Sequence, residues 1–591
     1  MKRVKKLFAL LLAMAMILAM SVTAFATEAG TNPADPTDSV PTTPMGPAEP
    51  NQSTYEKPDK DDVATAIVGN VEAGATVTAY RIVEPTYNDN GFTGYQAAKG
   101  VILKNILEPT SDEVTGIAAD EVLLPNLEQK PLKAQDGATG LTTYTGELGA
   151  GYWIVVVTGS AIQEVYNPML VGIYYSVKGS GDNNALVQGI VDANSDWSLN
   201  SQPAYAKSEQ PTLDKKITGS TGKDTSDGNE SGNDVAIGDT VNFEIDTKIP
   251  SYSASYTKVT VKITDTLGKG LTLAEAVGDK PVGNLVVMVN GEEVAAGDDT
   301  FTYTPADDKK SFEISFVSAY ALAHSGEDVV VTYDAVLGED AGINFDANTN
   351  TAKLEYTNDP NGETNEIEDK TYTYTFGIDA SLTGTWEDVT TELIKTGEEI
   401  DTVTGGKSPL DGATFTLTNN VTGAVYTTIS GKGEVGKDVD ADGELLPGVT
   451  EVAGMKPGYL KFTGLDAGEY TLKETKAPEG YSLNEKETEV VIEAEYNDDG
   501  TLKKYTITVN GEKTSNYVGN YDNGMTITSN PKHENDWSEI SDTEEIANTK
   551  LSALPSTGGI GTTIFTVAGC LIMIVAAGLF FASRRKTAKS E

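Results

Sequence analysis

Short stretches in which Thr, Val and Tyr alternate with other residues recur along most of the chain, and they constrain its fold most strongly. Clear examples are residues 76–82, 259–263 and 504–509. Successive side chains of a strand point to opposite faces, so a period of two is typical of strands with one buried face. Turn-forming sequences such as Asp442-Gly443 separate these stretches. The pattern predicts an all-β protein, most simply tandem immunoglobulin-like β-sandwich domains.

Both ends of the chain carry signals for export and membrane insertion. Residues 1–26 combine a basic start, an apolar segment and small residues, and they predict an N-terminal signal peptide. Residues 27–60 are rich in Pro, Thr, Asp and Asn, lack the apolar surface that offsets ordering entropy, and predict a flexible leader. Residues 560–582 are apolar and long enough to cross a bilayer as a C-terminal transmembrane helix, with 583–591 as a basic cytoplasmic tail.

The exported part is acidic and free of cysteine. The chain has 88 acidic and 43 basic residues, which give a formal net charge of -45 and argue against nucleic acid or anionic membranes as partners. The only cysteine, Cys570, lies in the predicted membrane segment, so no disulfide can form within the ectodomain. With Cys570 in the membrane segment, His324 and His533 do not provide a zinc-binding cluster, and we expect neither a metal nor another cofactor.

A pentapeptide stands just before the apolar segment and consists of Leu554, Pro555, Ser556, Thr557 and Gly558. This motif, the membrane stop and the basic tail, in that order, resemble the sorting signal of proteins that sortase attaches to the Gram-positive cell wall. The resemblance implies that the sortase cysteine attacks the bond between Thr557 and Gly558. The alternative is an ordinary single-pass anchor preceded by a chance pentapeptide.

A longer motif marks a C-terminal domain, predicted at 386–550. Residues 468–481 resemble the E-box of sortase-assembled pilins and of the B-type repeats of collagen-binding adhesins, which implies a CnaB-type domain. Tyr470, Leu472 and Glu474 share one face of the expected strand, and the first two are core residues. Glu474 is therefore predicted to be buried, and burial without a partner favours its protonated form.

Two further polar residues share this expected core. Lys395 alternates onto the face of Leu393, and Asn548 onto the face of Ile546. Burial favours the neutral Lys395 amine, which is a nucleophile, while protonated Glu474 would polarise the Asn548 carboxamide. The family resemblance implies a spontaneous isopeptide bond between Lys395 and Asn548 with loss of ammonia. The alternative is a lysine at a strand edge and a glutamate in a surface ion pair.

A middle domain, predicted at 205–385, repeats this chemistry with an aspartate. Residues 211–217, 263–267 and 356–360 resemble the middle domain of fimbrial pilins, in which aspartate assists a bond between lysine and asparagine. Parity and resemblance together predict Lys215 as nucleophile, Asp265 as acid and Asn358 as acceptor, with Asn350 as the second candidate acceptor. Ordinary strands with scattered polar residues are the alternative.

The first domain, predicted at 61–204, shows strand patterns without such a triad. Residues 74–80 and 165–169 resemble pilin N-terminal domains. Shafts built by sortase need an acceptor lysine, usually in a Tyr-Pro-Lys sequence at the end of this domain, and Tyr205-Ala206-Lys207 stands there. Ala206 departs from the usual proline, so the motif is incomplete. Lys207 is identified as the acceptor by its place at the end of the first domain. An exposed linker lysine without a function is the alternative.

These resemblances imply a secreted, wall-anchored major (backbone) pilin, the repeating subunit of a covalent fibre on the cell surface. The implied partners are sortases of the pilus class (class C) and the housekeeping class, identical subunits, peptidoglycan, accessory pilins and a host surface ligand. The chain would be a sortase substrate and not an enzyme, apart from autocatalytic cross-linking. The alternatives are a monomeric wall-anchored adhesin with the same domains as a stalk, or an accessory pilin at the tip or base.

Overall fold

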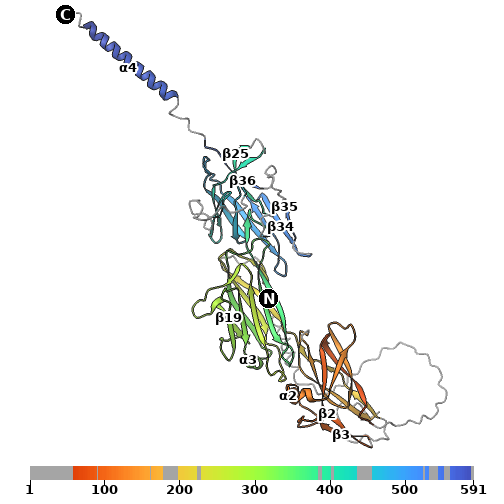
Figure 1. Ribbon diagram of the computed structural model, residues 1–591. Coiled ribbons are helices and arrows are strands. Elements are labelled where there is room, and N and C mark those ends of the chain that lie inside the picture. The colour runs from red at the N-terminus through yellow and green to blue at the C-terminus, as the bar shows by residue number, and fades with distance from the viewer. Residues whose placement is uncertain are drawn as a thin grey trace, which may run out of the picture. The chain divides into compact units, whose positions relative to one another are not determined.

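A computed structural model describes residues 58–89, 91–159, 162–177, 197–221, 228–383, 389–400, 405–434, 456–522, 526–530, 543–551 and 560–587. The predicted signal peptide, nearly all of the leader and the sorting motif at 554–558 lie outside these residues. Strands dominate the described part, which confirms the all-β prediction. They form three groups along the chain, here called the N-terminal, middle and C-terminal groups (Figure 1).

The N-terminal group is built on one large sheet. Its elements are β1 (Val63–Glu72), β2 (Thr76–Asn88), β3 (Gly91–Ala97), α2 (Ser111–Ala118), η1 (Leu124–Asn126), β4 (Gln129–Ala134), β5 (Leu141–Gly149), β6 (Gly151–Thr158), β7 (Val165–Tyr166), β8 (Met169–Val177), β9 (Trp197–Ser201), β10 (Ala204–Tyr205) and β11 (Ser208–Glu209). The sheet has the order β10-β1-β5-β4-β2-β6-β8-β9, and β3 pairs with β2. Thr110 caps the N-terminus of helix α2, and its capping box with Glu113 satisfies backbone N–H groups there.

The middle group is a sandwich of two sheets around one core. Its elements are β12 (Leu213–Ser220), β13 (Gly232–Asp234), β14 (Thr240–Lys248), β15 (Val261–Leu267), β16 (Leu271–Leu273), η2 (Val282–Asn284), β17 (Val286–Val289), β18 (Glu292–Glu293), β19 (Phe301–Pro305), β20 (Ser311–Phe316), α3 (Ser318–Ala323), β21 (Asp328–Leu337), β22 (Asn348–Thr357) and β23 (Thr364–Tyr374). One sheet has the order β12-β14-β21-β17-β18, with β16 also on β21; the other is β13-β23-β22-β15-β20-β19. Buried residues alternate with mostly half-buried ones along β14, β15 and β21, as expected for strands with one face in the core.

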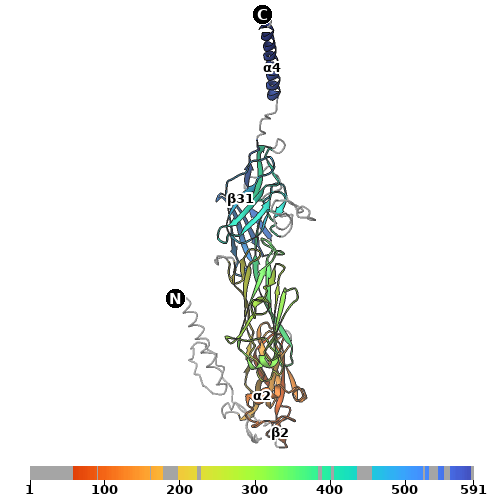
Figure 2. The same ribbon diagram turned by 90° about the vertical axis from the view of Figure 1, so that its left-hand side faces the viewer.

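The C-terminal group places its first and last long strands side by side. Its elements are β24 (Phe376–Ile378), β25 (Leu393–Ile400), β26 (Lys407–Pro409), β27 (Thr414–Asn419), β28 (Val425–Ile429), β29 (Gly433–Glu434), β30 (Phe462–Leu465), β31 (Gly468–Lys476), β32 (Thr488–Tyr496), β33 (Leu502–Val509), β34 (Lys513–Asn520), β35 (Thr526–Asn530) and β36 (Glu544–Asn548). The main sheet is β29-β28-β27-β31-β32-β33-β34-β35, and β26-β25-β36 form a smaller one. Figure 2 shows β31 among the strands of this group.

The hydrogen bonds between strands extend the outer groups beyond the predicted boundaries. β11 pairs with β7, so the N-terminal group keeps contacts as far as Glu209, past the predicted end at 204. β24 pairs with β30, and Phe376 and Ile378 are buried in the C-terminal core, although they precede residue 386. Along the chain, the middle group therefore begins after β11 and ends before β24.

The predicted membrane segment is helical. Helix α4 spans Ile560–Thr587, and its stretch Ile564–Arg584 is long and apolar enough to cross a membrane (Figure 1). At about 1.5 Å per residue this stretch covers roughly 30 Å, the thickness of a hydrocarbon core. The helix continues through the basic residues at 584–586, so the basic tail begins as part of the same helix.

Candidate functional sites

The two outer strands of the C-terminal group position a lysine and an asparagine. β25 and β36 pair in parallel, with Lys395 opposite Ile546 and Gly397 opposite Asn548. Glu474 comes from β31, whose alternating burial places it on the same inner face as Leu472. Lys395, Glu474 and Asn548 are at most 1% exposed. The structure thus brings together all three residues that strand parity predicted for this core.

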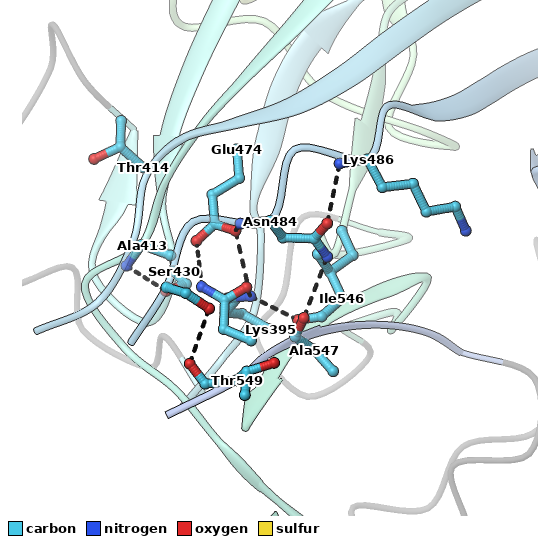
Figure 3. A network of polar contacts seen from close by, with 12 residues as sticks. Lys395, Ala413, Thr414, Ser430, Glu474, Asn484, Lys486, Ile546, Ala547 and Thr549 are labelled. Carbon is cyan, nitrogen blue, oxygen red and sulfur yellow. Dashed lines mark hydrogen bonds and ion pairs between the residues drawn. The ribbon is translucent and has the colours of Figure 1, made fainter. Parts of the chain in front are cut away.

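The three side chains form one closed contact network, part of which Figure 3 shows. Lys395 Nζ donates to Asn548 Oδ1 at 2.5 Å and to the Ile546 carbonyl at 2.8 Å. Asn548 Nδ2 donates to Glu474 Oε1 at 2.8 Å, and Glu474 Oε2 lies 3.6 Å from Lys395 Nζ. The backbone N–H of Asn484 donates to Glu474 Oε2 at 3.0 Å. The carboxyl group therefore touches both the amine and the amide that would react.

Burial makes the lysine of this site a better nucleophile. Desolvation lowers the pKa of Lys395 to about 8, although the nearby Glu474 carboxylate opposes this shift. A proton can pass from the Lys395 ammonium to the Glu474 carboxylate without leaving the core, and this transfer converts an ion pair into a neutral amine and a carboxylic acid. Those are the two forms that attack on an amide requires.

The middle group holds a second buried lysine beside an acid. Lys215 on β12 and Asp265 on β15 are at most 1% exposed, and Lys215 Nζ lies 2.5 Å from Asp265 Oδ2. The two residues come from different sheets, so their contact crosses the interior of the sandwich. Burial lowers the pKa of Lys215 and raises the pKa of Asp265, and the attraction between them opposes both shifts.

The structure places Asn350, and not Asn358, at this lysine. Lys215 Nζ and Asn350 Nδ2 both donate to the hydroxyl of Tyr333, the second at 2.7 Å. Asn358 lies after the end of β22, and its Nδ2 donates to the Ile162 carbonyl of the N-terminal group at 2.8 Å. Asp265 stands opposite Ala352 in the β15–β22 pairing, six residues or roughly 20 Å of strand from Asn358. Strand parity fixes the face of a residue but not its position along the strand.

Tyr333 is a member of this site that the sequence analysis did not single out. It lies on β21, is 2% exposed, and shares its buried face with Val331 and Ala335. A tyrosine at a core position between small aliphatic residues was the available signal, because a buried hydroxyl needs a polar partner.

The N-terminal group has no comparable site in its described part. Between residues 58 and 205, the buried side chains that the structure describes include no lysine, aspartate, glutamate or asparagine. Lys207 is exposed and stands between β10 and β11. Its neighbour Ala206 is buried and donates its N–H to the Gly69 carbonyl at 2.9 Å, while the Lys207 carbonyl accepts from Asn167 N at 3.4 Å. The backbone of Lys207 is thus held on both sides while its side chain faces solvent.

Comparisons with known protein families match four separate segments of the chain. Family descriptions match residues 61–208 (T6 antigen Ig-like domain), 237–360 (Gram-positive pilin backbone subunit 2, Cna-B-like domain), 396–514 (prealbumin-like fold domain) and 547–589 (LPXTG cell wall anchor motif). The predicted sorting pentapeptide and helix α4 fall within the last match.

The relatives agree with these matches. The chain is 29% identical over 566 residues to the trypsin-resistant surface T6 protein of Streptococcus pyogenes serotype M6, which covers 89% of this chain and 96% of the relative. The structure of the T6 backbone pilin of serotype M6 S. pyogenes superimposes with a TM-score of 0.55 at 23% identity, covering 84% of this chain and all of the other. The full-length major pilin SpaD of Corynebacterium diphtheriae gives a TM-score of 0.41 at 15% identity. The four domain matches and the relative of nearly full length show that this chain is similar along most of its length to Gram-positive backbone pilins and carries an LPXTG cell wall anchor motif.

Proposed function

We propose that this protein is a shaft subunit that sortase joins covalently through Thr557 and Lys207, and that two internal isopeptide bonds reinforce each subunit. The bonds join Lys395 to Asn548 with Glu474 as the acid, and Lys215 to Asn350 with Asp265 as the acid. The buried contact network of Lys395, Glu474 and Asn548 carries this proposal, because three polar residues from three strands meet there within hydrogen-bond or ion-pair distance.

The reaction in the C-terminal group follows from these contacts. The neutral Lys395 amine attacks Cγ of Asn548, whose Oδ1 already lies 2.5 Å from Nζ. Glu474 supplies a proton to the departing Nδ2, 2.8 Å from its Oε1, and takes one from the attacking nitrogen. In total one proton moves from the Lys395 nitrogen to the departing Asn548 nitrogen, and the products are one secondary amide and one ammonia. Because each site reacts once with itself, the chain has no turnover as an enzyme.

The middle group requires a change of acceptor from the sequence-based choice. Asn358 is held by the Ile162 carbonyl, whereas Asn350 shares a hydroxyl partner with Lys215. We therefore assign Asn350 as the acceptor.

Intact mass tests both bonds and the choice of acceptor. Each bond removes one ammonia, about 17 Da, so the mature chain should weigh about 34 Da less than its sequence predicts. Asn350→Ala should reduce this deficit to about 17 Da, while the matched variant Asn358→Ala should keep about 34 Da. A deficit that is lost in Asn358→Ala but kept in Asn350→Ala would restore the original acceptor, and a full sequence mass for the unaltered chain would refute cross-linking altogether.

Joining of subunits follows the order of the parts along the chain. Sortase would cleave after Thr557 and hold the chain as a thioester until the Lys207 amine of another subunit displaces the enzyme. The exposure of Lys207 and the pairing of its flanking residues support this role, since an acceptor must be accessible and its backbone fixed. Transfer to peptidoglycan would end growth and anchor the fibre.

A further inference from the structure

The two candidate cross-linking sites differ in how their acid reaches the acceptor amide. In the C-terminal group, the Glu474 carboxyl contacts both Lys395 Nζ and Asn548 Nδ2. In the middle group, Asp265 Oδ2 contacts Lys215 Nζ at 2.5 Å, but Asp265 Oδ1 and Asn350 Oδ1 are both buried without a hydrogen-bond partner among the described residues. Aspartate is one methylene shorter than glutamate, so its carboxyl group reaches less far from its strand.

The Tyr333 hydroxyl occupies the place between the amine and the amide. It accepts from Lys215 Nζ and from Asn350 Nδ2, the latter at 2.7 Å, and it also interacts with the Asp265 carboxyl group. One oxygen atom therefore contacts the nitrogen that would attack and the nitrogen that would leave. Among the described residues of the middle group, no other side chain hydrogen-bonds to both nitrogens.

We propose that Tyr333 is a catalytic residue of the middle site, which relays a proton from the attacking Lys215 nitrogen to the departing Asn350 nitrogen. This inference rests on the proposed bond between Lys215 and Asn350. Tyr333 and Asp265 together then perform what Glu474 performs alone in the C-terminal group.

The relay balances without any further reactant. Attack of the neutral Lys215 amine on Cγ of Asn350 forms the new C–N bond and leaves an extra proton on the Lys215 nitrogen. The phenol gives its own proton to Nδ2 as the Cγ–Nδ2 bond breaks, and it receives the extra proton from the Lys215 nitrogen. One ammonia departs, the secondary amide remains, and the phenol ends in its starting form. Asp265 stabilises the positive charge on the Lys215 nitrogen during attack.

Packing holds the phenol ready for this step. The Tyr333 ring stacks on Phe243 with ring centroids 5.4 Å apart and meets Phe312 edge-on at 4.9 Å. Lys215 Nζ lies 4.9 Å from the centre of the Tyr333 ring. Burial and the neighbouring Asp265 raise the pKa of Tyr333 well above its ordinary value, so the phenol keeps the proton that the relay needs.

The test compares the rate of bond formation in Tyr333→Phe with that of the unaltered chain. The mature chain, residues 27–557, is collected unfolded in urea directly after synthesis, folding is started by dilution, and aliquots are weighed as intact protein over time. Tyr333→Phe keeps the ring that packs on Phe243 and Phe312 and removes only the hydroxyl. Tyr303→Phe is the matched control, because Tyr303 packs on the same Phe312 but donates its hydroxyl to the Val282 carbonyl at 2.7 Å.

We expect Tyr333→Phe to form the C-terminal bond at the normal rate and the middle bond at least about tenfold more slowly, so that a deficit of about 17 Da precedes one of about 34 Da. Tyr303→Phe should follow the unaltered chain. A middle bond that forms in Tyr333→Phe as fast as in the unaltered chain would overturn the relay while leaving the cross-link itself in place. Absence of the middle bond from the unaltered chain would instead refute the proposed function.

A second variant covers the case in which Tyr333→Phe does not fold. Replacing Tyr333 by 3,5-difluorotyrosine keeps the hydroxyl and the ring but makes the phenol more acidic. A relay through this group should change the rate of the middle bond by at least about threefold, because proton transfer depends on the acidity of the donor. An unchanged rate would contradict the relay, and the same replacement at Tyr303 should have no effect.

Discussion

At the scale of single residues, the chemistry of both candidate sites depends on lysines whose amino groups are buried away from solvent. A lysine amine in water is protonated at neutral pH and does not attack amides, whereas burial penalises the ammonium form. Lys395 and Lys215 are both at most 1% exposed, and burial lowers the pKa of each. A buried acid within reach then keeps the net charge of the core at zero, so the lysine can be desolvated without an unpaired charge.

The acid of the C-terminal site gives the first prediction. Glu474→Gln keeps the shape of the side chain but removes the carboxyl group that contacts Lys395 and Asn548 and is proposed to exchange protons with them. We expect this variant to fold, to lack the bond between Lys395 and Asn548, and to lose on the order of 5 kcal/mol of stability with the loop constraint. Tandem mass spectrometry of proteolytic fragments and thermal unfolding would measure both effects.

Glu485→Gln provides a control, since Glu485 is exposed. Its stability should change by under about 0.5 kcal/mol, as is usual at the surface. Recovery of the joined Lys395 and Asn548 peptides from Glu474→Gln would show that Glu474 is not the acid of this site.

From the sequence, alternation predicts which face a residue takes within a regular strand, but it makes no prediction beyond the end of the strand. Alternation placed Lys395, Glu474 and Asn548 on inner faces, and the structure brings them into contact. Asn358 has the same parity as Asn350, but β22 ends at Thr357, and the Asn358 side chain follows a different direction. The register between β15 and β22 decides which asparagine faces the acid, and register depends on contacts far apart in sequence.

At the scale of elements, the C-terminal bond would join the first and last long strands of its group. Lys395 and Asn548 are 153 residues apart, and their strands β25 and β36 pair directly in parallel (Figure 1). Tension entering at β25 would pass through one covalent bond to β36 and leave toward the sorting motif. The strands between them would then bear little of the load, which suits a subunit that is pulled from both ends.

Two buried acidic residues form hydrogen bonds between other segments of the C-terminal group. Asp379, just after β24, accepts from the backbone N–H groups of Glu392 and Leu393 and from that of Leu460 at 2.8 Å. Glu392, just before β25, accepts from Asp379 N at 2.8 Å and from the Tyr517 hydroxyl. Both carboxyl groups are at most 2% exposed. Burial raises the pKa of each, and repulsion between the two carboxylates adds to the rise for Asp379.

The raised pKa values of Asp379 and Glu392 predict that the stability of the folded C-terminal domain falls as pH rises. An acid whose pKa is higher in the folded than in the unfolded chain binds more protons when folded, so its contribution is fully present below about pH 4 and is lost as pH rises through the folded pKa. Glu392→Gln removes one charge and the repulsion on Asp379, and its amide can still donate to the Tyr517 oxygen. We expect the melting temperature of the C-terminal domain to decline from pH 5 to pH 8, and to decline less in Glu392→Gln.

Differential scanning calorimetry at several pH values measures both slopes. Glu489→Gln, at an exposed position on β32, is the matched control and should keep the slope of the unaltered chain. Equal slopes in Glu392→Gln and the unaltered chain would mean that the pair does not titrate in this range.

The elements themselves were predictable in kind but not in partnership. Alternating Thr, Val and Tyr predicted strands because each residue type suits a half-buried pleated surface, and the structure has strands there. The parallel pairing of β25 with β36, and of β1 with β10, leaves no local signal, since it joins segments about 140 residues or more apart. The same reason explains why β24 was assigned to the middle domain, although it pairs with β30.

At the scale of the whole molecule, the net charge disfavours association of identical chains, whereas the sorting signal marks the chain for covalent attachment. A formal charge of -45 per chain makes identical subunits repel one another in solution. A fibre of such subunits gains little from surface contacts, so its integrity would depend on covalent joints between subunits. The order of predicted signal peptide, β domains, sorting motif and helix α4 can be read from the sequence because each part has its own composition. Lys207, the proposed acceptor, has only its position in the chain to identify it.

The last prediction therefore concerns Lys207. Lys207→Ala should collapse the high-mass ladder of wall extracts, boiled in detergent and immunoblotted, to a single monomer band, because the acyl-enzyme formed at Thr557 would lack an amine from the next subunit. The fold should persist, since the Lys207 side chain is exposed and the contacts of Gly69 and Asn167 in this region involve only backbone atoms of Ala206 and Lys207.

Lys99→Ala, at another exposed lysine of the N-terminal group, should leave the ladder intact. A ladder that survives Lys207→Ala but disappears in Lys99→Ala would move the acceptor within the same domain, whereas monomer alone from the unaltered chain would favour a wall-anchored adhesin over a shaft subunit.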